Sequence, residues 1–209
     1  MRPVTEQLER WLAAGGREIG EIAITRDEAG FELRHRADQG RTDLATHTGA
    51  EAARHLANAD EAGKFRPLKT APTLRRGWTL RVADGGELRR ALDYFYPAMS
   101  GVWAAHERGE LRPVPLRETL ARQTGMYRVT QLITDEQAQE LVGRACRSED
   151  GCLKHILWEL APGQPITTLS PEKLQAPPTT AALPLLCHEA CNLLVAEARS
   201  VVKKAQKPA

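Results

Sequence analysis

The chain has four cysteines, and all of them lie in its last 64 residues. Residues 1–145 contain none, after which Cys146, Cys152, Cys187 and Cys191 fall within 46 residues. They form a Cys-x5-Cys pair and a Cys-x3-Cys pair, separated by 34 residues. Thiolates are ligands for soft metals and iron–sulfur clusters, and in a reducing compartment grouped cysteines more often hold metal than form disulfides. The spacing therefore indicates a metal centre.

Two kinds of centre fit four thiolates. A [4Fe-4S] cluster is several ångströms across, so its ligands can come from separate segments with apolar walls. Structural zinc takes sulfurs at about 2.3 Å from one ion, usually from tight Cys-x2–4-Cys turns. One pair here has a wider gap and the other has helical spacing, which favours the cluster, with zinc as the alternative. Ordinary buried thiols are the third interpretation.

Helical periodicity predicts how the thiols are positioned. A last helix expected over residues 185–202 would place Cys187 and Cys191 one turn apart on its apolar face. Cys146 is expected at the inner face and C-terminal end of an earlier helix. The polar residues 147–151 would then form a loop that presents Cys152.

Other side chains near the cysteines have possible roles. His155 and His188 are alternative ligands, but four thiols complete a site, so both are expected on the surface. Trp158 is expected to shield the centre from solvent. Positive charges would stabilise anionic thiolates, and four are available: Arg144, Arg147, Lys154 and Arg199. The spacing shows no set of catalytic residues and no glycine-rich phosphate loop.

The remaining pattern predicts an α+β fold in two parts. Residues 1–84 are expected to form a small α+β domain with an N-terminal helix, a hairpin turning at 27–30 and a strand over 78–82. Residues 85–203 are expected to form a mainly helical domain that holds the metal centre, followed by a flexible tail over 204–209.

Composition argues against several classes of protein. No apolar run reaches the roughly 18 residues of a membrane helix, and the N-terminus lacks the apolar stretch of a secretory signal. We therefore expect a cytoplasmic protein with no membrane contact. Arginine pairs occur at 34–36, 75–76 and 89–90, but acidic residues interleave and the formal net charge is only +2. Nucleic-acid binding is not expected.

Several stretches together carry a resemblance to a known family. Besides the four cysteines, these are residues 92–97, Trp103, 116–127, 151–154, 156–158 and 184–192. They resemble the C-terminal iron–sulfur domain of certain bacterial sirohydrochlorin cobaltochelatase-like proteins. In that family a helical domain holds a [4Fe-4S] cluster through four cysteines, beside a small stabilising domain. The resemblance implies that Cys146, Cys152, Cys187 and Cys191 are the ligands, and residues 1–84 match the stabilising domain by position and size.

The resemblance also limits the expected activity. No part of residues 1–90 has the pattern of a chelatase domain, so chelatase activity is not carried over and the chain is not expected to be an enzyme by itself. We expect a redox or accessory protein whose cluster passes electrons or senses oxidation for a separate chelatase or redox partner. The alternative is a structural four-cysteine site, such as zinc, without a redox role. The sequence does not indicate an oligomeric state.

Overall fold

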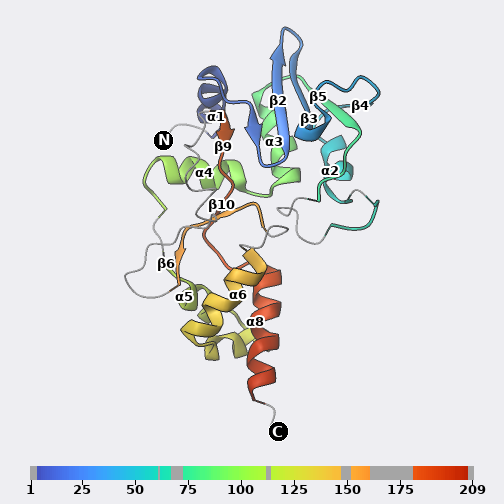
Figure 1. The fold of residues 1–209 in the computed structure, drawn as a ribbon. Coiled ribbons are helices and arrows are strands. Elements are labelled where there is room, and N and C mark those ends of the chain that lie inside the picture. Colours follow the sequence, from blue (N-terminus) through green and yellow to red (C-terminus); the bar gives the residue numbers. More distant parts are fainter. Residues whose placement is uncertain are drawn as a thin grey trace. The chain divides into compact units, whose positions relative to one another are not determined.

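The computed structural model divides the chain into two compact units. The first comprises Met1–Glu110 and Ala176–Leu185, and the second comprises Leu111–Gln175 and Leu186–Ala209. The residues described are 4–60, 62–66, 73–111, 114–146, 152–160 and 181–206. Figure 1 traces the chain through both units. Helices accompany a mixed sheet, which confirms the predicted α+β fold.

The division of the chain differs from the expected boundary after residue 84. Two helices beyond that point, α3 (Gly85–Phe95) and α4 (Met99–Glu107), belong to the first unit. The physical reason is packing, because Phe95 of α3 stacks on Trp78 of the sheet with ring centroids 5.1 Å apart. The change from mixed to helical pattern at residue 84 therefore marks a change of secondary structure within one compact unit.

The first unit contains a six-stranded sheet with the order β4-β5-β3-β2-β1-β9. Its strands are β1 (Glu18–Ile19), β2 (Ile22–Asp27), β3 (Gly30–His35), β4 (Ala45–Thr48), β5 (Trp78–Val82) and β9 (Ala182–Leu183). The predicted hairpin is confirmed as β2 and β3, and the predicted strand over 78–82 is β5. Gly30 closes the hairpin with φ 129°, where a side chain would collide with the carbonyl of Val82. Only glycine fits that position.

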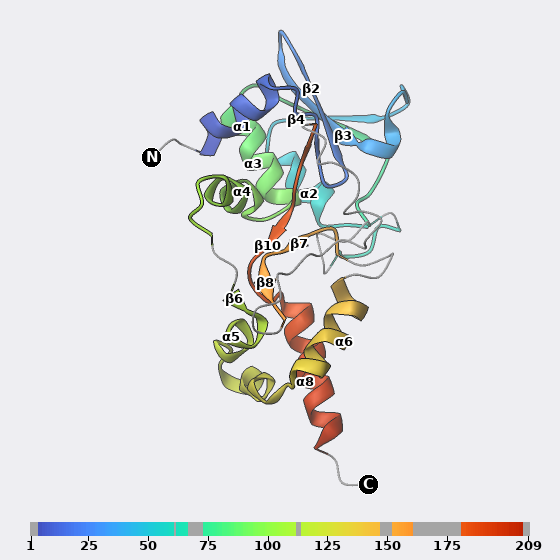
Figure 2. The ribbon, with the colours of Figure 1, turned by 60° about the vertical axis from the view of Figure 1, so that its left-hand side comes forward.

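Four helices and a 3-10 turn accompany this sheet. They are α1 (Val4–Ala13), α2 (Ala52–Ala57), α3, α4 and η1 (Arg36–Asp38), and Figure 2 shows them beside the strands. The predicted N-terminal helix is confirmed as α1, whose Leu8 and Leu12 are buried. Helix α3 begins at a capped N-terminus, since the Asp84 side chain accepts the backbone N–H of Glu87 at 2.8 Å.

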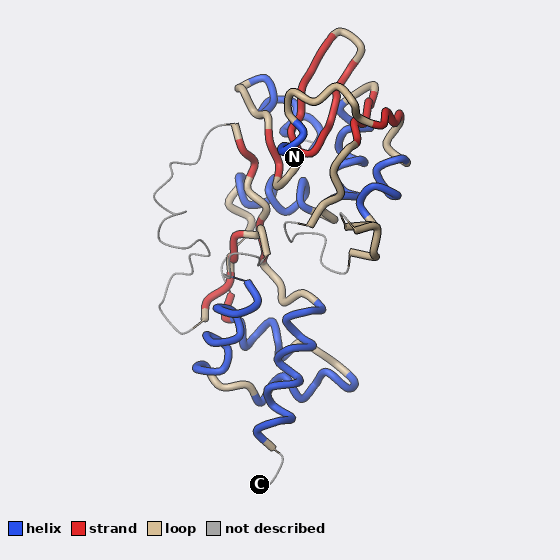
Figure 3. Tube along the Cα trace, turned by 45° about the vertical axis from the view of Figure 1, so that its right-hand side comes forward, coloured by secondary structure: helices blue, strands red, loops and turns tan. Residues whose placement is uncertain are grey.

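The second unit is built mainly from helices. They are α5 (Leu116–Ala121), the 3-10 helix η2 (Gly125–Leu132), α6 (Asp135–Cys146) and α8 (Asn192–Ala205). Two short parallel pairs complete it: β6 (Val114–Pro115) with β8 (Trp158–Glu159), and β7 (His155–Ile156) with β10 (Leu186–Cys187). Figure 3 shows the helices α6 and α8 of this unit in blue. None of the helices in the described ranges combines the length and apolar character that a membrane crossing requires.

Helices α6 and α8 pack against each other and bring their ends together. Arg144, near the C-terminal end of α6, forms an ion pair with Glu197, in the N-terminal half of α8, at 3.3 Å. A reciprocal cap fixes the start of α6, because the Gln137 N–H donates to Thr134 Oγ1 and the Thr134 N–H donates to Gln137 Oε1. The ion pair therefore links the last turn of α6 to α8.

Candidate metal centre

The C-terminal cysteine pair does not lie on one helix, and the predicted helix over 185–202 is wrong at its start. Helix α8 begins at Asn192, Cys191 is its N-cap residue and Cys187 lies in strand β10. The physical reason is that Leu186 and Cys187 extend to pair with β7. A short run of apolar residues does not distinguish a strand from a helix turn, so the sequence favoured the wrong element.

Cys191 is positioned by the N-terminus of α8. Its φ of −72° and ψ of 162° are those of an N-cap residue, and its Sγ accepts the N–H of Leu194 at 3.5 Å. The unpaired N–H groups of a helix N-terminus carry partial positive charge, which stabilises an anion placed there. A thiolate at Cys191 therefore receives both a hydrogen bond and a favourable dipole.

The pairing of β7 with β10 brings together the segments that carry Cys152 and Cys187. Cys187 is opposite Ile156 in the register of β10 and β7, and its carbonyl accepts the N–H of Leu157 at 2.6 Å. Cys152 precedes β7 by three residues, and its Sγ accepts the N–H of Lys154 at 3.5 Å. The pairing thus joins segments 35 residues apart in sequence.

Cys146 is the last residue of α6, as its periodicity predicted. Cys146 and Cys191 both pack against an apolar cluster in which Cys187 is itself a buried member. The cluster also contains Ile156 and Trp158. The expected loop over 147–151 lies outside the described residues. Three of the four cysteines therefore share one apolar wall, and the fourth is tied to it through β7.

Burial makes Cys187 an unusual thiol. Desolvation raises the pKa of its thiol to about 12, and the positive charge of Lys154 acts in the opposite direction. Cys152 and Cys191 lie near enough to raise this pKa slightly further, which places three sulfurs within electrostatic range. The Cys187 thiol donates a hydrogen bond to the carbonyl of Glu189 at 3.1 Å.

The four positively charged side chains expected near the thiols differ in what they contact. Arg144 is in its ion pair with Glu197, and the guanidinium of Arg199 lies 5.7 Å from the ring centre of Tyr127. Arg147 lies outside the described residues. Lys154 is half-buried and is the cation that acts on Cys187. The sequence identifies Lys154 as one of four possible cations, but it does not show that this side chain lies near Cys187.

The remaining candidates near the cysteines lie as follows. His155 is half-buried in β7, where desolvation lowers its pKa, so the expectation of a surface position is wrong for this residue. His188 lies 4.0 Å from Glu189 and is partly exposed. Trp158 is about 1% exposed, and its indole Nε1 has no hydrogen-bond partner in the described part of the chain. Trp158 is a buried member of the apolar cluster that contains Cys187.

Two structural features that bear on the thiols have no clear signal in the sequence. These are the backbone N–H of Lys154 and the start of α8 at Asn192. A cysteine is not among the residues that mark a helix N-cap, so the usual signal was missing. The polar Asn192 before the apolar Leu193 and Leu194 is the one hint that the helix begins there.

The donor set fits an iron–sulfur cluster. Four thiols from separate segments, an apolar wall and backbone N–H donors to two sulfurs suit such a group, and the buried indole N–H of Trp158 has no acceptor among the described residues. Among the described residues, no three His, Cys, Asp or Glu side chains are grouped in a way that could hold one metal ion.

Some of the arginines that the sequence analysis considered for nucleic-acid binding form ion pairs with carboxylates in the first unit. Arg34 pairs with Glu32, and Arg89 lies 3.7 Å from Asp93. These pairs reduce the free positive charge that phosphate contacts would need.

The raised pKa of Cys187 predicts slow alkylation. In the metal-free chain, iodoacetamide should modify Cys187 far more slowly than an ordinary thiol at pH 8, because only the thiolate reacts. Since the folded pKa is above the usual value, the rate should still rise above about pH 10, where ordinary thiols have levelled off. Peptide mass spectrometry of time points measures this, and equal rates at all four cysteines would contradict it.

Comparisons with known proteins match the chain to two family models. The family model of the DR2241 stabilising domain matches residues 4–108, and that of a 4Fe-4S iron-sulfur cluster binding domain matches residues 108–200. The search of curated proteins found no match. The zinc alternative gains no support from these matches.

A solved structure is also similar over almost the whole chain. It is DR2241 from Deinococcus radiodurans, described as a multi-domain protein with structural similarity to chelatases and two additional novel domains. The identity is 34% and the TM-score 0.75, over 96% of this chain but 41% of that one. The chain thus spans less than half the length of that protein. It belongs to the family of the DR2241 stabilising domain, and that domain is followed here by a 4Fe-4S iron–sulfur cluster binding domain.

Proposed function

We propose that this chain is a redox or accessory protein in which Cys146, Cys152, Cys187 and Cys191 hold a [4Fe-4S] cluster. The observation that carries the proposal is that Cys146, Cys187 and Cys191 lie in or against one apolar cluster, while Cys152 precedes the strand β7 that pairs with β10. These residues lie inside the segment that matches a 4Fe-4S domain.

Each side chain has a definable part in such a site. The four Sγ atoms are the ligands, and the N–H groups of Lys154 and Leu194 stabilise two of them as thiolates. Ile156 and Trp158 exclude water. When bound, a [4Fe-4S] cluster supplies one-electron oxidation and reduction.

The partner that we propose is a separate chelatase or redox protein in the cytoplasm. The support is indirect: the larger DR2241 is described as similar to chelatases, and this chain matches 41% of its length. A role in electron transfer or oxidation sensing for tetrapyrrole or cobalt-chelatase chemistry is consistent with a cluster domain that accompanies such an enzyme.

A second candidate function is purely structural. It is favoured by the burial of Cys187, which is 9% exposed within the main apolar cluster of its unit. Metal ligands embedded in a core contribute folding free energy directly. A structural centre would hold α6, β10 and α8 together and would not need to exchange electrons.

Metal and sulfide analysis of protein purified without oxygen tests the proposal. The expected result is about four iron and four sulfide per chain, with a broad absorption band near ~400 nm. A reversible midpoint potential in spectroelectrochemistry would support the redox role, and a site that does not change its redox state would support the structural one. One zinc per chain without sulfide would contradict the iron–sulfur cluster and the redox role, and would leave a structural site with four thiolate ligands.

Lys154 should raise the midpoint potential of the centre. Reduction adds negative charge, and a nearby ammonium stabilises the reduced state, so Lys154→Met should lower the potential while Lys154→Arg retains it. The exposed Lys203, in the last turn of α8, provides the control, and Lys203→Met should leave the potential unchanged. Spectroelectrochemical titration of the four proteins measures this. Equal potentials for Lys154→Met and the parent protein would remove Lys154 from the site.

A further inference from the structure

The first unit contains a buried arginine that none of the preceding roles uses. Arg66 is about 1% exposed, and its Nε, Nη1 and Nη2 atoms are buried with no hydrogen-bond partner among the described residues. A guanidinium carries five N–H donors and keeps its proton in proteins. Burying such donors without acceptors is strongly unfavourable, so Arg66 needs an acceptor that the described residues do not provide.

The backbone holds Arg66 in place. Ala59 and Phe65 form an antiparallel bridge, and the Arg66 N–H donates to the carbonyl of Asn58 at 3.0 Å. Within this turn, the Asp60 carboxylate accepts two backbone N–H groups at 2.9 Å. The inward position of Arg66 is therefore fixed by a closed turn on its N-terminal side.

The groups around Arg66 do not satisfy its N–H donors. Its Cζ lies 5.9 Å from the ring centre of Tyr96, a contact made through the ring face and not through an acceptor. Glu21 is nearby and buried, but its Oε2 accepts the N–H of Leu74 at 3.1 Å and its Oε1 lies 3.4 Å from His35 Nε2. The Glu21 N–H in turn donates to the Tyr96 hydroxyl at 2.8 Å. Both carboxylate oxygens thus face partners other than the guanidinium.

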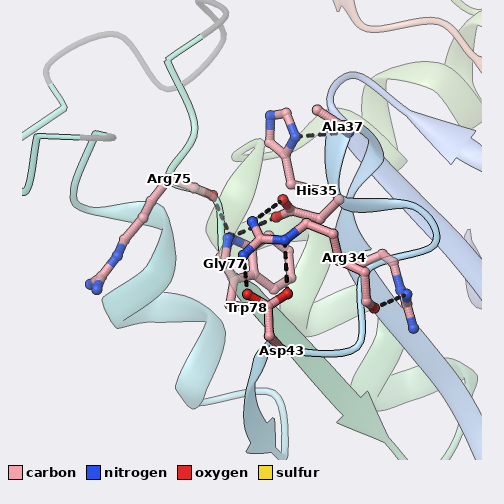
Figure 4. Close-up of polar contacts among 9 residues, drawn as sticks. Arg34, His35, Ala37, Asp43, Arg75, Gly77 and Trp78 are labelled. Carbon is pink, nitrogen blue, oxygen red and sulfur yellow. Dashed lines mark hydrogen bonds and ion pairs between the residues drawn. The ribbon is translucent and has the colours of Figure 1, made fainter.

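Among the buried groups here, Arg66 carries a positive charge and Glu21 a negative one, but no hydrogen bond joins them among the described residues. Figure 4 shows that His35 accepts the N–H of Ala37, through Nδ1 at 3.0 Å. The Tyr96 hydroxyl is influenced by two cations, Arg36 and Arg66, and by one carboxylate. Burial raises the pKa of this hydroxyl, so it is neutral.

We propose that Arg66 binds a small planar monoanion of the carboxylate class inside the first unit. A carboxylate meets the edge of a guanidinium with two parallel hydrogen bonds, which would satisfy the donors that are now without acceptors. The ligand is small because Arg66 is almost fully enclosed. Formate, acetate and hydrogencarbonate share the required geometry. The proposal is independent of the iron–sulfur site.

Thermal unfolding of the full, cluster-loaded chain tests this site. Formate, acetate or hydrogencarbonate is titrated in a buffer free of carboxylates, against chloride at matched ionic strength. A ligand bound only to the folded state raises Tm with saturation. We expect a saturable rise for the parent chain and for the control Arg90→Met, a 64% exposed arginine, and none for Arg66→Met. The anion with the lowest half-saturation concentration identifies the preferred ligand.

Two results would overturn the proposal: the same rise in Arg66→Met, or no rise beyond that caused by chloride. If Arg66→Met does not fold, Arg66→Lys and arginine-labelled NMR spectra replace it. One Nε–H signal, absent in Arg66→Lys, should then shift saturably with the anion, and the absence of any such shift would reject the site. Iron content is measured throughout, so a failure of the cluster assignment is recognised separately.

Discussion

Cys187→Ser is expected to lose most of the bound iron and to unfold the second unit under conditions in which the parent chain is folded. Cys187 is a proposed ligand and also a buried member of the apolar cluster, so the change removes a metal bond and buries a hydroxyl. Losses of this kind exceed about 4 kcal/mol. Iron and sulfide analysis, with circular dichroism during urea unfolding, measures both effects.

Two further variants distinguish loss of a ligand from loss of structure. Cys191→Ser removes a thiolate but supplies serine, which is a good N-cap, so α8 should still begin at Asn192 while iron is lost. Leu193→Ser, at a 43% exposed neighbouring position, is the control and should retain iron. Full iron in Cys187→Ser would remove that residue from the ligand set.

Local sequence signals predicted those parts of the site that local interactions determine. The position of Cys146 at the end of α6 follows from apolar periodicity and from the cap at Thr134, both contained in one segment. The position of Cys187 depends on pairing with β7, about 30 residues earlier in the chain, and two-residue strands have almost no periodicity of their own. The sequence therefore identified all four candidate cysteines and misplaced one of the elements that carry them.

The same distinction explains the fold of the first unit. The hairpin of β2 and β3 has a turn and alternating residues that can be recognised within fourteen positions. Strand β9 joins the sheet from more than 160 residues away, by pairing in parallel with β1. Such a pairing is stabilised by tertiary contacts and leaves little trace in a two-residue segment. The unit boundary was misplaced for a related reason, because the packing of Phe95 on Trp78 is a tertiary contact.

Trp158→Ala is expected to destabilise the second unit by about 3–5 kcal/mol, the usual cost of removing a buried tryptophan. Trp158 is about 1% exposed and belongs to the apolar cluster that contains Cys187. Opening this wall should also speed the loss of iron in air. Urea unfolding without oxygen, and the decay of absorbance near ~400 nm in air, measure the two effects.

Trp158→Phe separates the volume of the side chain from its N–H group. Since Nε1 has no partner within the described residues, removing it breaks no hydrogen bond to any of them, and the expected loss is only about 1–2 kcal/mol for the smaller ring. Trp11→Ala, in the first unit, controls for the loss of a tryptophan and should leave the decay in air unchanged. If Trp158→Phe and Trp158→Ala lost stability and iron equally, the site would require the N–H group and not the volume of the indole. That result would indicate a donor to a cluster sulfur, because no described protein group accepts this hydrogen.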